Sequence, residues 1–329
     1  MIFQLSRSLY LIVIHICIPT DVFPMAEKKI IHLIDHLQKE LRALHREILS
    51  FSEEQKERLS DFTGALRGRG LDPFRRNPTQ HLLFPPVFPL KEKFYELFKK
   101  YSFRLFLREI IIHKGKFRVA EVVRFSSPET GRTYLHFLID LGLAEPIGNA
   151  TYRLRHSCPA SLGPTLEWFI AEVLRREFAC PALYGLRVKG SRYGGDYDVV
   201  ALLEGRLVYL EVKSSPPKNI EGDEVQAFLG RMEDLLPHLA LFFVDTELRL
   251  KDKIVPFFET ELQARGFRDN GAPPAIQKIG DEIFFIPPRI YILSSKRSIV
   301  KNIGTCFRNH FTFSLSKNWG EGLWEPLRG

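Results

Sequence analysis

The stretch GGDYDVVALLEGRLVYLEVKSS, residues 194–215, constrains the fold more than any other part of this sequence. It has two apolar runs around Glu204-Gly205, a two-residue loop of the kind that closes tight β-hairpins. The register that follows from this turn places Asp198 directly opposite Glu211 on the neighbouring strand. Charged residues are poor strand formers and are costly to bury unless they are paired or bound to a metal. The stretch therefore predicts a hairpin that brings two acids face to face.

The alternation of side chains along a strand places Asp198, Glu211 and Lys213 on one face of this hairpin. Asp196 falls opposite Lys213. The other face, which suits a core, carries Val199, Ala201, Val208, Leu210 and Val212. Directly opposite Cβ atoms lie about 4.5–5.5 Å apart, so facing carboxylates are destabilising. A divalent cation would relieve the repulsion; the alternative is that the three charged residues form structural salt bridges.

An acid on one strand, a turn, and Glu-x-Lys on the next strand resemble the PD-(D/E)xK nuclease superfamily over about Gly163 to Phe313. The sequence departs from that motif because no proline precedes the acid, which lies in Asp-Tyr-Asp. The resemblance implies a metal-dependent nuclease acting on DNA. Asp198, Glu211 and the Val212 carbonyl would hold Mg²⁺ or Mn²⁺, and Lys213 would orient the nucleophile.

The same superfamily places a helix before the hairpin, often with a glutamate that faces the site. Residues 163–178, GPTLEWFIAEVLRREF, predict such a helix, with Pro164 in its first turn and an apolar stripe at helical spacing. Glu167 borders that stripe, whereas Glu172 points the opposite way. We expect Glu167 to complete the metal shell; the alternative is a solvated glutamate at a helix start, where the dipole favours it.

After the hairpin, residues 223–236 predict a second amphipathic helix. Its inward stripe is expected to be Val225, Phe228, Leu229, Met232 and Leu236. Relatives in the superfamily often carry a glutamine here that supports the site, and Gln226 matches it. The alternative is an ordinary surface glutamine.

The remaining segments continue to alternate between buried strands, such as LALFFVDTE, and helices, such as IVPFFETELQARGF. Strands and helices that take turns argue for an α/β layer structure. Residues 160–316 are therefore expected to form an α/β nuclease domain with a central mixed sheet flanked by helices.

Residues 93–156 predict three helices and a small hairpin around Gly148-Asn149, a pattern that resembles the winged helix-turn-helix. Ser127 and Pro128 supply an N-cap and a first helical residue for the third helix. If this domain binds DNA, four residues of that helix would lie near bases or phosphates, namely Thr130, Arg132, Thr133 and His136. Winged helices also act as protein-interaction modules, so this alternative stays open.

The N-terminal part, residues 26–67, predicts a helical coiled-coil-like segment. Its apolar residues recur at steps of three and four: Ile34, Leu37, Leu41, Leu44, Ile48 and Phe51. The seam would either pair two chains into a homodimer or fold back on the next helix. Residues 68–92, rich in glycine, proline and arginine, are expected to be a basic linker. Residues 1–24 hold an apolar run too short to span a bilayer, and they favour a mis-called upstream extension over a secretion signal.

Composition sets the outer bounds. The chain has 329 residues, of which 45% are hydrophobic, and its charge is 47 basic minus 39 acidic, or +8. This excess suits an anionic partner such as DNA. Four widely spaced cysteines, Cys17, Cys158, Cys180 and Cys306, lack metal-ligand spacing and are typical of reduced packing residues. We expect a cytoplasmic protein without a membrane partner. A non-catalytic DNA-binding or regulatory protein that retains the nuclease fold is the alternative to a nuclease.

Overall fold

The computed structural model describes residues 32–34, 36–43, 61–84, 90–123, 127–156, 158–267 and 274–319. The chain divides into two units, Met1–Ser60 and Asp61–Gly329. The predicted extension 1–24 and three heptad residues, Leu44, Ile48 and Phe51, lie outside the described residues. In the first unit Leu37 and Leu41 lie on a helix and are exposed, so the paired seam stays a prediction.

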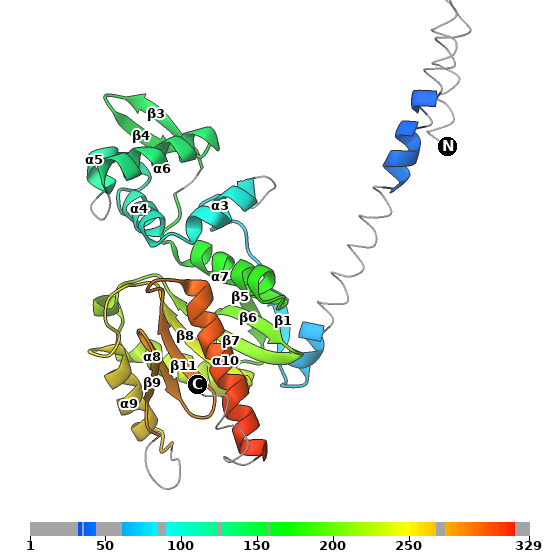
Figure 1. Ribbon diagram of the computed structural model, residues 1–329, viewed down its shortest axis with the longest axis vertical. Coiled ribbons are helices and arrows are strands. Elements are labelled where there is room, and N and C mark those ends of the chain that lie inside the picture. Colours follow the sequence, from blue (N-terminus) through cyan, green and yellow to red (C-terminus); the bar gives the residue numbers. More distant parts are fainter. Residues whose placement is uncertain are drawn as a thin grey trace, which may run out of the picture. The chain divides into compact units, whose positions relative to one another are not determined.

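The second unit is built on one eight-stranded sheet (Figure 1). Three adjacent strands, β7, β8 and β11, run parallel to one another, and the other neighbours pair antiparallel. The expected mixed sheet is therefore present. From edge to edge the strands are β1 (Asp72–Arg75), β5 (Ala182–Lys189), β6 (Tyr197–Leu203), β7 (Arg206–Lys213), β8 (Leu239–Val244), β11 (Ile290–Ser294), β10 (Ile283–Ile286) and β9 (Gln277–Gly280).

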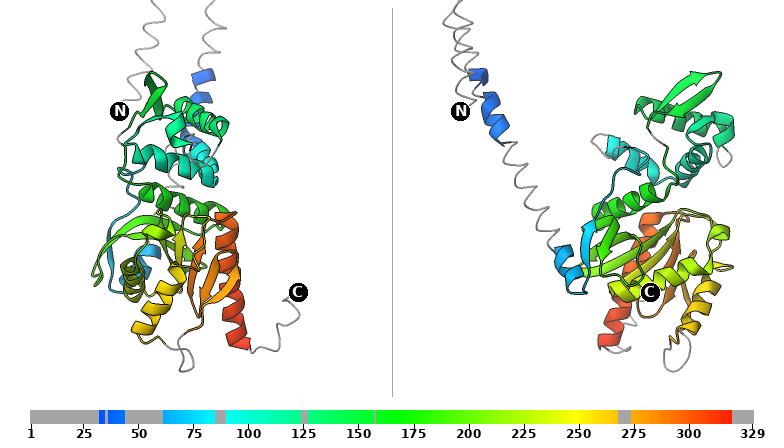
Figure 2. Two further views of the ribbon diagram at one scale, coloured as in Figure 1. Left: turned by 90° about the vertical axis from the view of Figure 1, so that its left-hand side faces the viewer. Right: turned by 180° about the vertical axis from the view of Figure 1, so that it is seen from behind.

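Helices cover both faces of this sheet (Figure 2). One face packs against α7 (Gly163–Glu177) and α10 (Ile299–Trp319). The other packs its aromatic rings against α8 (Gly222–Leu235) and α9 (Ile254–Ala264). Parallel strands need cover on both sides, so the hairpin face that carries Glu211 is also buried. Among the described residues, no helix has the length and apolar character needed to cross a membrane.

The hairpin β6–β7 has the predicted turn and register. Val199 pairs with Leu210 and Leu203 with Arg206. Both turn residues, Glu204 and Gly205, have positive φ, at 50° and 74°, as the tightest two-residue turns require. Asp198 and Glu211 follow one step beyond the last paired residues.

Between the first strand and α7 the described residues form four helices and a three-stranded sheet, whereas the sequence predicted three helices and a small hairpin. The helices that follow α3 (Leu90–Phe98) are α4 (Tyr101–Ile112), α5 (Val119–Val122) and α6 (Pro128–Asp140), and the strands are β2 (Lys116–Arg118), β3 (Ala144–Gly148) and β4 (Thr151–Leu154). Their order along the chain is α4-β2-α5-α6-β3-β4, with strand order β2-β4-β3 in the sheet. Whether this order makes a DNA-binding winged helix stays a prediction.

Two details of this region test the local predictions. The N-cap of α6 is confirmed, because the Ser127 hydroxyl accepts the N–H of Thr130 at 3.1 Å. The hairpin turn lies one residue later than expected. Gly148 pairs with Thr151, so Asn149 and Ala150 form the turn, and both have positive φ. A bulge between Pro146 and Gly148 shifts the register and moves the turn.

The described residues of the range 68–92, which are 68–84 and 90–92, do not form the linker expected from their glycines and prolines. They contribute β1, which pairs with β5 at the edge of the main sheet. Asn77 extends this attachment, because its N–H donates to Tyr184 O and its side-chain oxygen accepts the N–H of Tyr184. Leu82, Leu83 and Phe84 are buried in the core. The predicted domains 93–156 and 160–316 accordingly lie within one compact unit.

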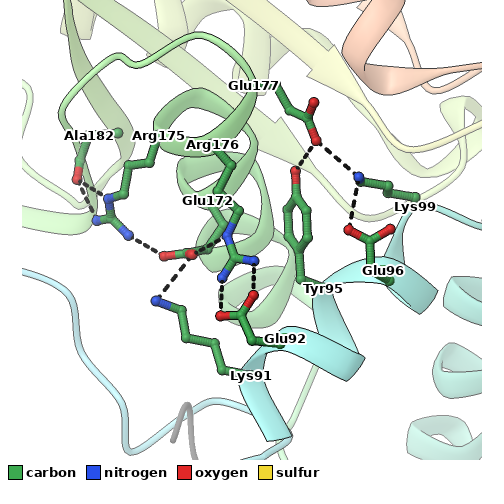
Figure 3. Close-up of polar contacts among 10 residues, drawn as sticks. All are labelled: Lys91, Glu92, Tyr95, Glu96, Lys99, Glu172, Arg175, Arg176, Glu177 and Ala182. Atoms are coloured by element: carbon green, nitrogen blue, oxygen red, sulfur yellow. Dashed lines mark hydrogen bonds and ion pairs between the residues drawn. The ribbon is translucent and has the colours of Figure 1, made fainter. Parts of the chain in front are cut away.

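The junction between α3 and α7 combines stacked rings with a charged network (Figure 3). Phe84 stacks on Phe94 at 3.9 Å and meets the edge of Trp168 in α7. Beside them the buried carboxylate of Glu172 is bound by three cations: Lys91, Arg175 and Arg176. Burial acts to raise the pKa of Glu172, but these cations outweigh it and lower the pKa. Glu172 is thus a structural residue that points away from the hairpin acids, as predicted.

A second junction joins α4 to the end of β8. Asp245, with 0% exposure, accepts Arg104 Nη2 at 2.8 Å, and Arg104 itself is 1% exposed. Arg108 Nη2 reaches the same carboxylate at 2.9 Å. The Asp245 N–H donates to the carbonyl of Lys213, the last residue of β7. The contact therefore fixes the helical region to the sheet directly beside the predicted catalytic lysine.

Replacing Arg104 tests how much this junction contributes to the stability of the fold. Arg104→Leu leaves the buried Asp245 charge with Arg108 alone, so we expect a loss of about 3–5 kcal/mol in unfolding free energy. The matched control is Arg67→Leu, which breaks the exposed pair of Arg67 and Asp72 (69% and 57% exposed) and should cost under about 1 kcal/mol. Urea unfolding measures both. Equal losses of unfolding free energy in the two variants would contradict a stabilising role for the ion pair between Arg104 and Asp245.

Candidate active site

The open end of the hairpin holds a deeply buried carboxylate, Glu211, which is 2% exposed. Lys213 Nζ lies 2.8 Å and Arg231 Nη2 lies 2.7 Å from its Oε1 atom. The Tyr209 hydroxyl donates to its other oxygen. Burial acts to raise the pKa of Glu211, but the two cations outweigh burial and the pKa is lowered. Glu211 is therefore ionised and fully partnered.

Asp198, opposite Glu211, is held differently. Its Oδ2 atom accepts the N–H of Val212 at 2.7 Å, which closes the ladder where β6 begins. It forms no ion pair with any described residue. Loss of hydration, followed by repulsion from Glu211 and Glu167, raises the pKa of Asp198 well above its ordinary value. The sheet thus carries one acid that has cationic partners and one that lacks them.

Glu167 approaches these acids from α7. Burial, followed by repulsion from Asp196 and Glu211, raises the pKa of Glu167 from 4.5 to about 8. A solvated glutamate at a helix start would keep an ordinary pKa, so the structure disfavours that alternative. Glu167 is therefore close enough to the hairpin acids to be repelled by them, and its place in a metal shell stays a prediction.

Lys213 lies between the hairpin and α8. Its Nζ atom contacts Glu211 and also Glu224 Oε2, at 2.6 Å. Burial acts to lower the pKa of Lys213, but the two carboxylates outweigh burial and raise it. Lys213 therefore stays protonated at neutral pH, so it can neutralise or orient a ligand but cannot accept a proton from water.

Three expectations about neighbouring residues need correction. Gln226 has an exposed side chain, and Glu224 is the α8 residue that meets Lys213. Asp196 does not face Lys213, because it precedes β6 and binds Arg75, at 2.5 Å, and Arg187. The helix α8 ends at Leu235, and Leu236 adopts a left-handed conformation with an exposed side chain.

Two site residues were missed in the sequence. Tyr209 and Arg231 both bind Glu211, and Arg231 Nε also donates to the Tyr209 hydroxyl at 2.9 Å. The signal for Tyr209 was its position two residues before Glu211, on the same strand face. Arg231 adjoins the predicted inward stripe of α8, where a charged residue beside Met232 is unusual.

The residues predicted to contact nucleic acid lie together on α6. Arg132, Thr133 and His136 are exposed, and Thr130 is half-buried. Thr130 takes part in the N-cap, and the Thr133 hydroxyl donates to the carbonyl of Glu129 at 3.1 Å. Their exposure permits contact with a partner and leaves the identity of that partner open.

The acidic side chains of this site are the right chemical type to bind a divalent metal, but they are not yet arranged to hold one. Asp198, Glu167 and Glu211 supply hard oxygen ligands, and the raised pKa values of the first two show an excess of negative charge that a cation would relieve. In the part of the chain that is described, however, no three His, Cys, Asp or Glu residues are grouped closely enough to hold an ion. Metal binding would therefore require these side chains to adjust.

A groove of about 800 Å³ lies at the other end of the hairpin. It is lined by the turn residues Glu204 and Gly205 together with apolar side chains of α10 such as Phe307 and Phe311. None of the acids described above lines it. The groove is therefore separate from the candidate active site.

The sequence matches no protein-family model and no curated protein. The solved structures that are similar to this chain include two with 13% sequence identity each. Protein VC1899 from Vibrio cholerae has a TM-score of 0.44, over 77% of this chain and 61% of that chain. Can2 from Sulfobacillus thermosulfidooxidans, in complex with cyclic tetra-adenylate, has a TM-score of 0.39, over 55% of this chain and 50% of that chain. This chain thus spans less than two thirds of either, and the similarity is too low to support an argument about function.

The raised pKa of Glu167 predicts a pH effect on stability. Between pH 4.5 and about 8 an unfolded glutamate loses its proton while the folded one keeps it. Stability should therefore fall as pH rises through this window, and Glu167→Gln should flatten that fall and raise the melting temperature at pH 8.5. Thermal unfolding in the absence of divalent ions measures this pH dependence. The control is Glu259→Gln, which changes an exposed glutamate. Parallel pH profiles for wild type and Glu167→Gln would refute the predicted shift.

Proposed function

We propose that this protein is a metal-dependent nuclease that hydrolyses phosphodiester bonds, most readily in DNA. The observation that carries the proposal is Asp198, a partly buried acid with no ion-pair partner among the described residues, set against Glu211 and near Glu167. Structural salt bridges explain Glu211, but they do not include Asp198, which among the described residues accepts only the N–H of Val212. Acids whose pKa values are raised by burial and by one another are typical of functional sites.

In this proposal Asp198, Glu211, the Val212 carbonyl and Glu167 hold Mg²⁺ or Mn²⁺. Such an ion, when bound, lowers the pKa of a water and offsets charge that develops on the phosphate. Lys213, which stays cationic, neutralises the phosphate and orients the attacking water. Because the pKa of Glu167 is about 8, this residue must release its proton to serve as a ligand at neutral pH.

Arg231 has a structural part in the same proposal. It binds both Glu211 and the Tyr209 hydroxyl, and so it fixes the orientation of the Glu211 carboxylate. Lys213 and Arg231 share the same oxygen, Oε1, so Lys213 can turn toward a phosphate while Arg231 keeps Glu211 compensated.

The flanking parts of the chain supply the proposed contacts with partners. A winged-helix-like region would bind duplex DNA through Arg132, Thr133 and His136 on α6, mostly at phosphates and with strong salt dependence. The heptad residues of the N-terminal unit, among them Leu37 and Leu41, would pair two chains into a homodimer.

A non-catalytic DNA-binding or regulatory protein is the second candidate, and one observation favours it. Glu211 is already neutralised by Lys213 and Arg231, so this carboxylate needs no ion. Such a protein would bind nucleic acid without cutting it, and Asp198→Asn would leave its binding unchanged.

Cleavage assays separate the two candidates. The full chain is incubated with labelled duplex, branched and single-stranded DNA, and with RNA, in Mg²⁺, Mn²⁺ or EDTA. We expect metal-dependent cleavage that Asp198→Asn abolishes and that Lys213→Ala reduces by about 10²-fold or more. The matched controls Asp252→Asn and Lys278→Ala change exposed residues outside the site and should cut normally.

Metal binding supplies an independent readout. Added Mg²⁺ should raise the melting temperature of the wild type by mass action and should not do so for Asp198→Asn. If the wild type neither binds a divalent ion at millimolar concentration by calorimetry nor cuts any of these substrates, the nuclease proposal is wrong.

A further inference from the structure

The loop between β5 and β6 presents a tyrosine whose ring is fixed in place. Tyr193 is 47% exposed, although its ring lies directly against Gly230 of α8. A methyl group at Gly230 would stand 2.4 Å from Tyr193 Cδ1, so only glycine leaves room for the ring. The Tyr193 hydroxyl donates to Glu233 at 2.7 Å, one turn further along the face of the helix. The ring is thus held at both ends while nearly half of its surface stays in solvent.

The backbone that carries this ring is fixed by one carboxylate. Asp234, which is buried, accepts four hydrogen bonds from the loop: the Ser191 hydroxyl, the Arg192 and Tyr193 N–H groups, and Arg192 Nε. Burial acts to raise the pKa of Asp234, but these donors lower it, so the carboxylate is ionised. A surface loop bound this tightly loses little entropy when a ligand binds to it.

The loop also adjoins the candidate active site. Gly195, two residues after Tyr193, lies against Arg231, since a methyl group there would stand 3.6 Å from Arg231 Nη1. Arg231 in turn contacts Glu211. Gly230, the seat of the tyrosine ring, immediately precedes Arg231 in α8. The loop that carries Tyr193 is therefore linked through Arg231 to the carboxylate of Glu211.

Arg192 gives this surface a positive charge. Its side chain is 72% exposed, and Asp234 holds it through Nε, which leaves the outer end of the guanidinium directed to solvent. An exposed ring beside an exposed guanidinium is the pair that binds single-stranded nucleic acid, because the ring stacks on a base and the cation meets a phosphate.

We propose that Tyr193 and Arg192 form a stacking platform for an unpaired base, which would direct single-stranded or locally unpaired nucleic acid to the acids. This inference rests on the proposed nuclease function and names its substrate class. A base in a duplex already stacks on its neighbours, so the platform selects strands whose bases are free.

Binding assays without cleavage test the platform. The full chain is titrated, in EDTA, into oligonucleotides that carry 2-aminopurine, either single-stranded or as a perfect duplex. We expect 2-aminopurine quenching only with the single strand and about tenfold weaker single-strand binding for Tyr193→Leu. Tyr193→Phe keeps the ring and should bind almost normally. Gly230→Ala, which displaces the ring, should behave like Tyr193→Leu, and Arg192→Ala should reduce the salt dependence of binding.

The outcomes separate this inference from the nuclease proposal. Quenching that Tyr193→Leu abolishes, in a protein that never cuts, would support the platform and refute the nuclease. Cleavage by a protein in which Tyr193→Leu and Tyr193→Phe bind single strands equally well would refute the platform alone. Equal affinity of the wild type for duplex and single strand, with no quenching, would also refute it. Circular dichroism and melting temperature confirm that each variant is folded. If either Tyr193→Leu or Gly230→Ala fails this check, the other of the two is compared with Tyr193→Phe.

Discussion

The buried charge of Asp245 is the constraint on which the arrangement of this protein depends. A carboxylate with no exposed surface is tolerated only when cations satisfy it, and here both cations come from α4. The helical region consequently cannot move away from the sheet without leaving this charge unpaired. Since Asp245 also binds the backbone of Lys213, the same ion pair positions the end of β7. Asp245 therefore links the helical region directly to the candidate active site.

Two acids of the candidate active site do not follow this rule. Glu172, Glu211 and Asp234 are buried acids that the fold supplies with cations or several N–H donors, and the pKa of each is lowered. For Asp198 and Glu167, burial and repulsion from neighbouring carboxylates outweigh the nearby donors and cations, so their pKa values are raised. The fold thus compensates Glu172, Glu211 and Asp234, whereas it keeps Asp198 and Glu167 close enough to repel each other, at a cost in stability. This contrast, more than the motif itself, favours a functional explanation.

The hairpin could be predicted from the sequence because its information is local. A two-residue turn and the alternation of side chains along the strands place Asp198 opposite Glu211. The apolar stripe of the preceding helix indicates the direction of Glu167. Contacts between distant segments could not be predicted in this way. Nothing near Asp245 in the sequence indicates Arg104, and the glycines and prolines before β1 hid an edge strand that only pairing with β5 reveals. On α8 the sequence indicated the correct helix but the wrong residue, because Glu224 rather than Gln226 lies on the turn that faces Lys213.

The two outer strands of the sheet have a consequence for behaviour at high concentration. An open sheet presents unpaired N–H and C=O groups at each edge, to which a strand of another molecule can add. Here β1 is only four residues long, contains Pro73 and is interrupted by a bulge, and β9 is equally short, with Lys278 and a bulge of its own. Both edges are poor templates for a further strand. Molecules of this protein should therefore resist polymerisation through the edges of the main sheet.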